Sequence, residues 1–239
     1  VELGDGNMCD LVAYDVEDYG ISEFAENVDV SDGDVRRERS MMPFKYLDAD
    51  MGKFRWDIYG CDVSMERKKA ESFMLGFHEF QKSGKWLYIY SKTRGSGKTF
   101  LSCALANEVL KRLDVCVKFV SVPELMKMTK EGYRDFARKE DLSIIRAAEL
   151  LILDDIGAEM KKEWVDAELF QLIDFRSNNR MVTVFTSNVE MHDLRLDGRT
   201  VDRINESSVR LHIPEKPIRA IKAEKENLEF LQEILKTPH

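Results

Sequence analysis

The sequence lacks the features that define several common protein classes. No apolar run approaches the roughly 18 residues that a membrane span requires, and the first residues show no basic-then-apolar signal pattern. The chain has four cysteines, none in a C-x-x-C pair, and only four histidines, which argues against a zinc knuckle and predicts free thiols. Membrane-spanning, collagen-like and secreted disulfide-rich classes are therefore excluded, and we expect a cytoplasmic protein with no membrane partner.

Charge is distributed unevenly along the 239 residues. Residues 1–40 contain twelve acidic and three basic side chains, a net charge of −9. Because the whole chain carries −8, residues 41–239 carry +1. We expect residues 1–40 to be an acidic, flexible N-terminal segment, with docking of a partner as the alternative. Residues 41–239 have an ordinary length for one globular domain.

Apolar strand patterns alternate with helical patterns after residue 41. Strands are expected at 86–90, 115–120, 149–153, 181–186 and 209–213. Helices are expected at 64–83, 100–112, 123–130, 142–148, 163–180 and 217–235. This alternation predicts an α/β fold in which a five-stranded parallel sheet is flanked by helices on both faces.

A glycine-rich turn, Ser91-Lys-Thr-Arg-Gly-Ser-Gly-Lys-Thr99, follows the first predicted strand and precedes a helix. Small residues there let backbone N–H groups surround a phosphate, while a lysine reaches the outer phosphates and a hydroxyl binds Mg²⁺. The expected nucleotide-binding residues are Lys92, Thr93, Arg94, Gly95, Ser96, Gly97, Lys98, Thr99 and Phe100. One residue departs from G-x-x-x-x-G-K-T, since Lys92 stands at the first glycine; if that position needs a positive φ, lysine is strained there.

Two carboxylates and one amide follow predicted strands. Asp154 is expected to hold Mg²⁺ together with Thr99, and Asp155 is expected to polarise the attacking water. Asn188 follows the strand at 181–186 and would orient that water, because strand C-termini line one edge of such a sheet. Each residue alone is also compatible with an ordinary turn or helix cap.

Three arginines near the C-terminus complete the candidate catalytic set. Arg199 and Arg203 are four residues apart on a predicted helix, so they share a face that can reach the γ-phosphate of a neighbouring subunit. Arg219 opens the last helix and can reach the nucleotide in cis. Surface ion pairing is the alternative for Arg199 and Arg203.

These motifs carry a resemblance when taken in order. They are Leu-Leu-Ile-Leu-Asp-Asp-Ile-Gly-Ala-Glu, Phe-Thr-Ser-Asn, Gly-Arg-Thr-Val-Asp-Arg-Ile and Pro-Ile-Arg. From about Phe44 to about Ala220 the chain resembles the AAA+ ATPase domain of bacterial and phage helicase loaders of the DnaC/DnaI type. The transposition ATPase IstB shares much of this pattern.

The resemblance assigns a role to each matched residue. It implies Lys98 and Thr99 as the Walker A pair, Asp154 and Asp155 as the Walker B pair, Asn188 as sensor 1, Arg203 as the arginine finger with Arg199 nearby, and Arg219 as sensor 2. It places residues 53–59 near the adenine. It also implies a P-loop AAA+ core for residues 41–239, and with one closing helix we expect no large C-terminal lid domain.

The resemblance further implies ATP or ADP with Mg²⁺ as cofactors, and ATPase activity that is stimulated by oligomer formation and by DNA. The partners would be a replicative helicase, single-stranded DNA and further copies of the chain bound through the ATP sites, in the initiation of DNA replication. Family members grip DNA through a helical element between the second and third strands, here residues 121–149. Bases interleaved with aromatic residues suit single strands, and the expected contacts are Lys127, Lys130, Tyr133 and Arg134. Acidic residues in the same interval are equally compatible with a solvated helix.

Three other functions remain open from the residues. An IstB-like regulator of transposition would share the same ATPase residues and differ only in its partner. A small-molecule P-loop kinase would need an arginine-rich lid, and the sequence shows none. A nucleotide-dependent interaction module without turnover is compatible with Lys92 and with Asp155 where many ATPases have glutamate.

Overall fold

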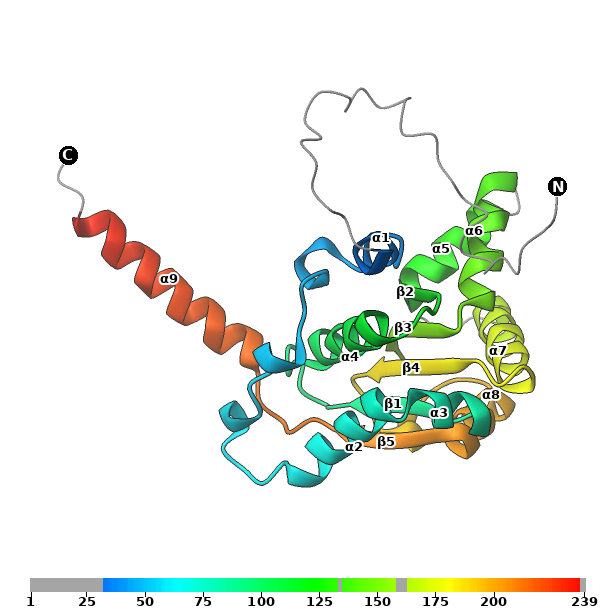
Figure 1. Ribbon diagram of the computed structural model, residues 1–239, viewed down its shortest axis with the longest axis horizontal. Helices are drawn as coiled ribbons and strands as arrows, with labels where there is room; N and C mark the ends of the chain where they lie inside the picture. The colour runs from blue at the N-terminus through cyan, green and yellow to red at the C-terminus, as the bar shows by residue number, and fades with distance from the viewer. Residues whose placement is uncertain (1–31, 133–134, 158–162, 237–239) are drawn as a thin grey trace.

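The computed structural model describes residues 32–132, 135–157 and 163–236, which form three layers with a sheet between two groups of helices (Figure 1). Its five strands all pair in parallel, in the order β2-β3-β4-β1-β5. They are β1 (Trp86–Tyr90), β2 (Val117–Ser121), β3 (Leu150–Ile156), β4 (Val182–Ser187) and β5 (Ser208–His212). The predicted five-stranded parallel α/β fold is confirmed.

The helices follow the predicted alternation, with one helix (Asp32–Glu38) that was not expected and two clear differences in bounds. They are α1 (Asp32–Glu38), α2 (Ser64–Leu75), α3 (Phe77–Ser83), α4 (Lys98–Arg112), α5 (Val122–Gly132), α6 (Phe136–Ala147), α7 (Glu163–Asn178), α8 (Gly198–Ser207) and α9 (Ile218–Lys236), with 3₁₀ turns at Phe44–Tyr46, Met51–Lys53, Trp56–Tyr59 and Met191–Asp193. The predicted helix 64–83 is interrupted at Gly76, where a Cβ would lie 2.9 Å from the Ser72 carbonyl oxygen. Helix α6 begins at Phe136, six residues before the predicted start.

Strand β1 is buried on both faces, so its side chains alternate between two cores. Leu87 and Ile89 of β1 belong to the core formed with α2 and α4. Trp86 and Tyr88 of the same strand belong to the core formed with α5, α7 and α8. This two-sided burial explains why β1 is a continuous apolar and aromatic run rather than an alternating pattern.

A buried arginine joins three neighbouring elements. Arg176 of α7 is 1% exposed, and it donates to the Thr183 hydroxyl and to the backbone carbonyls of Arg146, Ala148 and Val182. Burial lowers the pKa of its guanidinium, and these acceptors replace the water that the charge has lost. Arg176 therefore joins the end of α6 to the starts of β3 and β4.

The described part of the acidic segment contacts the body of the domain. Ser40 is fully buried, and its carbonyl oxygen accepts a hydrogen bond from the backbone N–H of Phe119 in β2 (2.7 Å). Arg36 forms an ion pair with Asp114 at 2.7 Å. The domain boundary after residue 40 stays a prediction.

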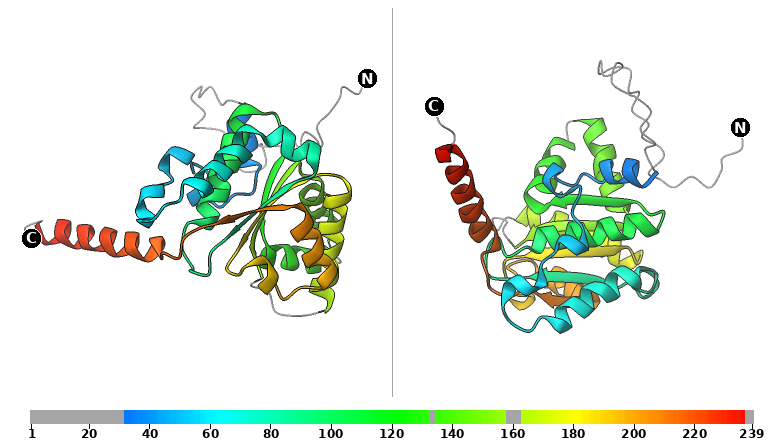
Figure 2. Two further views of the ribbon diagram at one scale, coloured as in Figure 1. Left: turned by 90° about the horizontal axis from the view of Figure 1, so that it is seen from below. Right: turned by 60° about the vertical axis from the view of Figure 1, so that its left-hand side comes forward.

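Helix α9 is the element described after β5, and it projects away from the three layers (Figures 1 and 2). The absence of a large C-terminal lid domain stays a prediction. None of the helices in the described ranges is both long and apolar enough to cross a bilayer. Cys61 and Cys103 are free thiols, whereas Cys116 is disulfide-bonded, so the prediction of free thiols is wrong for Cys116.

Candidate functional site

The phosphate loop lies between the C-terminus of β1 and the N-terminus of α4. Gly95 and Gly97 adopt positive φ angles of 71° and 106°, which glycine adopts without strain. The φ of Lys92 does not lie in the positive range. The strain anticipated for lysine at this position therefore does not arise, because the backbone there stays in a region open to any residue.

Lys98, the first residue of α4, points back into the loop and is 6% exposed. Its ammonium group donates to the carbonyl oxygens of Ser91 (3.1 Å) and Thr93 (3.0 Å) and to the Ser96 hydroxyl (3.3 Å). Burial lowers the pKa of Lys98, while the nearby charges of Asp155 and Glu215 oppose this shift. The loop thus surrounds the ammonium group of Lys98.

Thr99 and Asp154 meet across the site. The Thr99 hydroxyl donates to Asp154 Oδ1 at 3.0 Å, and the Thr186 hydroxyl donates to the same oxygen at 2.6 Å. Burial raises the pKa of Asp154, and the two hydroxyl donors partly offset that rise. A hydroxyl and a carboxylate oxygen at this separation are hard oxygen donors of the kind that Mg²⁺ prefers, so these two residues fit the ion.

A β-bulge presents the two acidic residues. Leu153 pairs with Phe185 and Ile156 pairs with Ser187, so Asp154 and Asp155 together oppose Thr186 alone. Asp155 has a φ of 64°, and its N–H leaves the strand ladder to donate to the Thr186 hydroxyl at 2.9 Å. Thr186 therefore binds both members of the acidic pair.

Asn188 follows β4 and contacts the second carboxylate. Its side-chain amide donates to Asp155 Oδ1 at 2.6 Å, which fixes the orientation of that carboxylate. The structure thus brings together Lys98, Thr99, Asp154, Asp155 and Asn188, from the C-terminal ends of three neighbouring strands.

The segment before α2 covers the loop from the side on which the adenine is expected. The Tyr59 hydroxyl donates to the Ser96 carbonyl oxygen at 2.6 Å. A Cβ on Gly97 would lie 3.1 Å from that hydroxyl and 3.3 Å from the Phe54 ring. The ring of Phe100 stacks on Phe54, with centroids 6.2 Å apart. This close packing explains why position 97 must be glycine.

The start of α9 contacts the same loop. The backbone N–H of Arg219 donates to the Gly95 carbonyl oxygen at 2.9 Å, and a Cβ on Gly95 would lie 2.9 Å from Arg219 Cβ. Lys216, in the linker before α9, donates to the Ile58 carbonyl oxygen at 2.6 Å. Arg219 therefore lies beside the loop, and its contact with the nucleotide stays a prediction. The side chain of Arg94 is exposed.

Arg199 and Arg203 lie on α8, which packs against α7 (Figure 1). Arg203 pairs with Asp174 at 3.3 Å, and Arg199 lies over the Phe170 ring at 4.5 Å. In the described part of the chain these arginines contact α7 and their own helix, rather than the phosphate loop. A role in trans at a neighbouring subunit stays a prediction.

The predicted DNA-binding residues lie on and after α5. Lys127 is exposed and lies 3.4 Å from Glu124, and the ammonium group of Lys130 lies over the Trp164 ring at 4.9 Å. Tyr133 and Arg134 lie outside the described residues. The two described lysines are available to solvent, and the DNA contacts stay a prediction.

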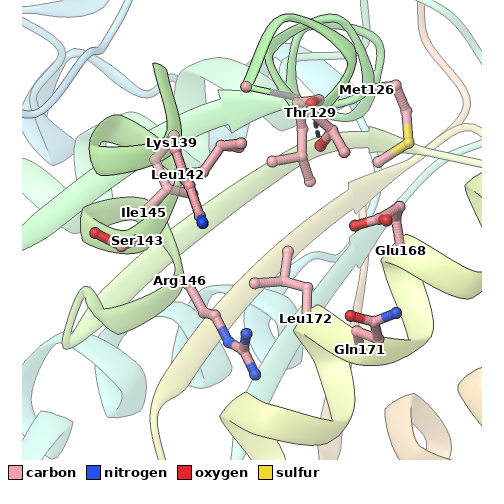
Figure 3. Close-up of a pocket in the computed structure, with 12 residues that line it drawn as sticks. Met126, Thr129, Lys139, Leu142, Ser143, Ile145, Arg146, Glu168, Gln171 and Leu172 are labelled. Atoms are coloured by element: carbon pink, nitrogen blue, oxygen red, sulfur yellow. Dashed lines mark hydrogen bonds between the residues drawn. The ribbon is translucent and has the colours of Figure 1, made fainter. Parts of the chain in front are cut away.

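A cavity of about 500 Å³ lies between α5, α6 and α7 (Figure 3). Its lining includes apolar and polar side chains, among them Leu125, Leu142, Leu172, Lys139, Arg146 and Glu168. These elements differ from those that form the phosphate loop, so the cavity is separate from the candidate nucleotide site.

Three residues with close contacts to the site were missed by sequence reasoning. Thr186 belongs to the Phe-Thr-Ser-Asn motif, and a hydroxyl at the end of a strand beside the acidic pair could have indicated its role. Tyr59 lay within the segment assigned to the adenine, but nothing local marks its bond to the loop. Glu215 contacts the start of the loop from more than 120 residues away, and no local pattern marks it.

Comparison with known proteins agrees with this geometry. The family described as IstB-like ATP binding protein matches residues 85–198. The replicative helicase loader DnaI of Bacillus subtilis is 30% identical over 166 residues, which cover 67% of this chain and 52% of DnaI. The replicative helicase loader DnaC of Escherichia coli K12 is 28% identical over 121 residues, 49% of each protein. The chain therefore spans about half the length of these curated relatives.

A solved structure covers more of the domain. The crystal structure of DnaI superposes with a TM-score of 0.63 at 30% identity, and the match covers 73% of this chain and 95% of that one. The superposition shows that the two chains share a fold. The chain belongs to the family of DnaI/DnaC-type helicase loaders, with an IstB-like ATP-binding AAA+ domain.

Proposed function

We propose that this chain binds and hydrolyses ATP with Mg²⁺, and that it acts as a loader of a replicative helicase in DNA replication. The observation that supports ATP chemistry most directly is that Lys98, Thr99, Asp154, Asp155 and Asn188 lie together at the C-terminal ends of three neighbouring strands. Hydrogen bonds of 2.6–3.0 Å join Thr99 to Asp154 and Asn188 to Asp155. The names of the helicase-loader relatives support the biological role.

Each side chain has a proposed task. Lys98 and the loop N–H groups bind the phosphates, and Arg219 approaches them from α9. Asp155, oriented by Asn188, accepts a proton from the attacking water. Mg²⁺, when bound by Thr99 and Asp154, neutralises charge on the phosphate oxygens.

Steady-state ATPase assays with and without single-stranded DNA test this proposal. We expect Asp155→Ala to keep ATP binding and to lose about 10²–10⁴-fold in turnover, the usual contribution of a general base. Asp193→Ala, which removes an exposed carboxylate of the 3₁₀ turn after β4, should leave turnover unchanged. Retained turnover in Asp155→Ala would remove the catalytic role assigned to that residue.

Self-association through the ATP site is the second part of the proposal. Arg203 is partly exposed on α8, and an incoming phosphate would replace its present partner Asp174. Arg203→Ala should bind ATP and lose roughly 10³-fold or more in turnover. Mixing Arg203→Ala with Asp155→Ala should restore part of the activity, because each protomer supplies what the other lacks; a mixture no more active than its components contradicts a finger in trans.

The partner distinguishes the helicase loader from the alternative function. The match to the IstB-like family over residues 85–198 favours an ATP-dependent regulator of transposition as the second candidate. Co-purification with the cognate replicative helicase, in ATP and in ADP, separates the two. Binding of an oligothymidylate by wild type and by Lys127→Glu tests the DNA contact, and equal affinity would argue against it.

A further inference from the structure

The linker between β5 and α9 holds a carboxylate that the proposed ATPase roles leave unused. Glu215 accepts hydrogen bonds from the backbone N–H groups of Lys92 (2.9 Å) and Thr93 (2.5 Å). It also accepts one from the Ser91 hydroxyl at 3.0 Å. Three consecutive residues at the start of the phosphate loop thus share one acceptor, and we call this arrangement the Glu215 clasp.

The charge of Glu215 strengthens these bonds. Partial burial raises the pKa of this carboxyl, but the hydrogen bonds from Thr93, Lys92, His212 and Ser91 outweigh burial and bring the pKa to about 2. Glu215 is therefore ionised at neutral pH. Hydrogen bonds to an ionised acceptor are roughly twice as strong as neutral ones.

The clasp acts where this sequence departs from the usual loop pattern. Lys92 replaces the first glycine, and its ammonium group pairs with Glu190 at 3.1 Å, two residues beyond Asn188. The side chain of Lys92 is thus tied to the chain after β4, while its backbone is tied to the chain after β5. The start of the loop is held from two directions.

The same linker contacts the rest of the nucleotide site. Arg219 bonds to the Gly95 carbonyl oxygen at 2.9 Å, and Lys216 bonds to the Ile58 carbonyl oxygen at 2.6 Å. Glu215 precedes both residues. One short segment therefore contacts the start of the loop, its middle and the covering segment before α2.

We infer that Glu215 is a positioning residue, which holds the start of the phosphate loop in the conformation that receives ATP and couples that loop to α9. The inference rests on the ATP binding proposed above. Two effects oppose each other when Glu215 loses its charge: the loop is loosened, and repulsion of the anionic phosphates falls. The Glu215 side chain is 40% exposed, so solvent screens the repulsion, and the direct hydrogen bonds decide the sign.

Hydrogen exchange of the backbone amides tests the clasp without nucleotide. Wild-type protein should protect the amides of Lys92 and Thr93, and Glu215→Gln should expose them to exchange at least tenfold faster. The matched control is Glu71→Gln, which removes a carboxylate of similar exposure (42%) paired with Arg67 on α2. Unprotected amides in wild type, or equal exchange in Glu215→Gln, would overturn the inference; the wild-type measurement holds even if a variant does not fold.

Titration with a fluorescent ATP analogue and steady-state kinetics test the positioning role. Glu215→Gln should bind ATP about 10-fold more weakly, the effect of roughly one lost charge-assisted hydrogen bond, and should raise KM for ATP with little change in kcat. Glu215→Asp keeps the charge but is too short for all three donors, so it should behave like Gln. Wild-type affinity in both variants, or tighter binding in Glu215→Gln, would overturn the positioning role.

Failure of the proposed function has a different outcome in these experiments. Wild-type protein would then bind no ATP analogue, and Glu71→Gln would bind none either. Failure of the inference alone leaves wild type and Glu71→Gln able to bind, with Glu215→Gln indistinguishable from them.

Discussion

Thr186→Val tests the hydroxyl that holds both acidic residues at the bulge between β3 and β4. That hydroxyl donates to Asp154 Oδ1 at 2.6 Å and accepts from the Asp155 N–H at 2.9 Å. Valine has nearly the same size but forms neither bond. Thr186 is 1% exposed, so water has little access to replace the lost partners.

The expected loss of stability follows from these two bonds. A hydrogen bond to a charged group contributes about 1.5–3 kcal/mol, and a buried N–H left unpaired costs about 1–3 kcal/mol. Asp154 keeps its bond from Thr99, and the added methyl group regains about 0.8 kcal/mol of apolar burial. We expect Thr186→Val to lower the free energy of unfolding by about 2–5 kcal/mol, and Tm by about 5–15 °C for a domain of this size.

Urea unfolding of Thr186→Val and Thr129→Val measures this effect against a matched control. Thr129 is also buried (8% exposed), but its hydroxyl donates only to the Leu125 carbonyl of the same helix, at 2.9 Å. Because that carbonyl keeps its helical N–H donor, Thr129→Val should cost less than about 1 kcal/mol. Equal losses in the two variants would refute the role given to Thr186 in the bulge.

Three further predictions follow from other contacts. Gly97→Ala and Gly60→Ala both place alanine at a positive φ, which costs about 1–2 kcal/mol in each variant. A Cβ at position 97 would lie 3.1 Å from the Tyr59 hydroxyl, whereas a Cβ at position 60 has no atom within 4 Å. Gly97→Ala should therefore lose ATP binding in a titration, and Gly60→Ala should keep it. The pKa of Glu215 is about 2, below its ordinary 4.5, so the stability that wild type gains over Glu215→Gln should be complete above pH 4.5 and vanish as pH falls towards 2 in denaturant titrations. Arg176→Met leaves buried carbonyl groups unpaired and should lower the free energy of unfolding by more than about 3 kcal/mol in urea; a smaller loss would show that these acceptors find other donors.

Local patterns predicted most of the fold. The apolar run of β1, the glycine-rich turn and the helix after it are contiguous, so their order alone indicates a phosphate loop. Because parallel strands end at the same edge of a sheet, the sequence predicted that Asp154, Asp155 and Asn188 lie close together. The break at Gly76 was missed because the charged, amphipathic pattern continues across it.

Contacts between distant segments escaped prediction. The bulge depends on how β3 pairs with β4, and the sequence of neither strand shows that two residues will oppose Thr186. The backbone angle of Lys92 depends on partners more than 90 residues away. The sequence therefore left open whether position 92 needs a positive φ, and the structure shows that it does not.

Helix α9 is attached to the phosphate loop at one end only. This helix has 19 residues and, at 1.5 Å per residue, is about 28 Å long. Its base is tied to the Gly95 carbonyl, whereas Leu228 and Leu231 farther along are exposed. A pivot of about 10° at the base would move the far end by about 5 Å, so a small change in the backbone of the phosphate loop would be larger at the exposed leucines of α9.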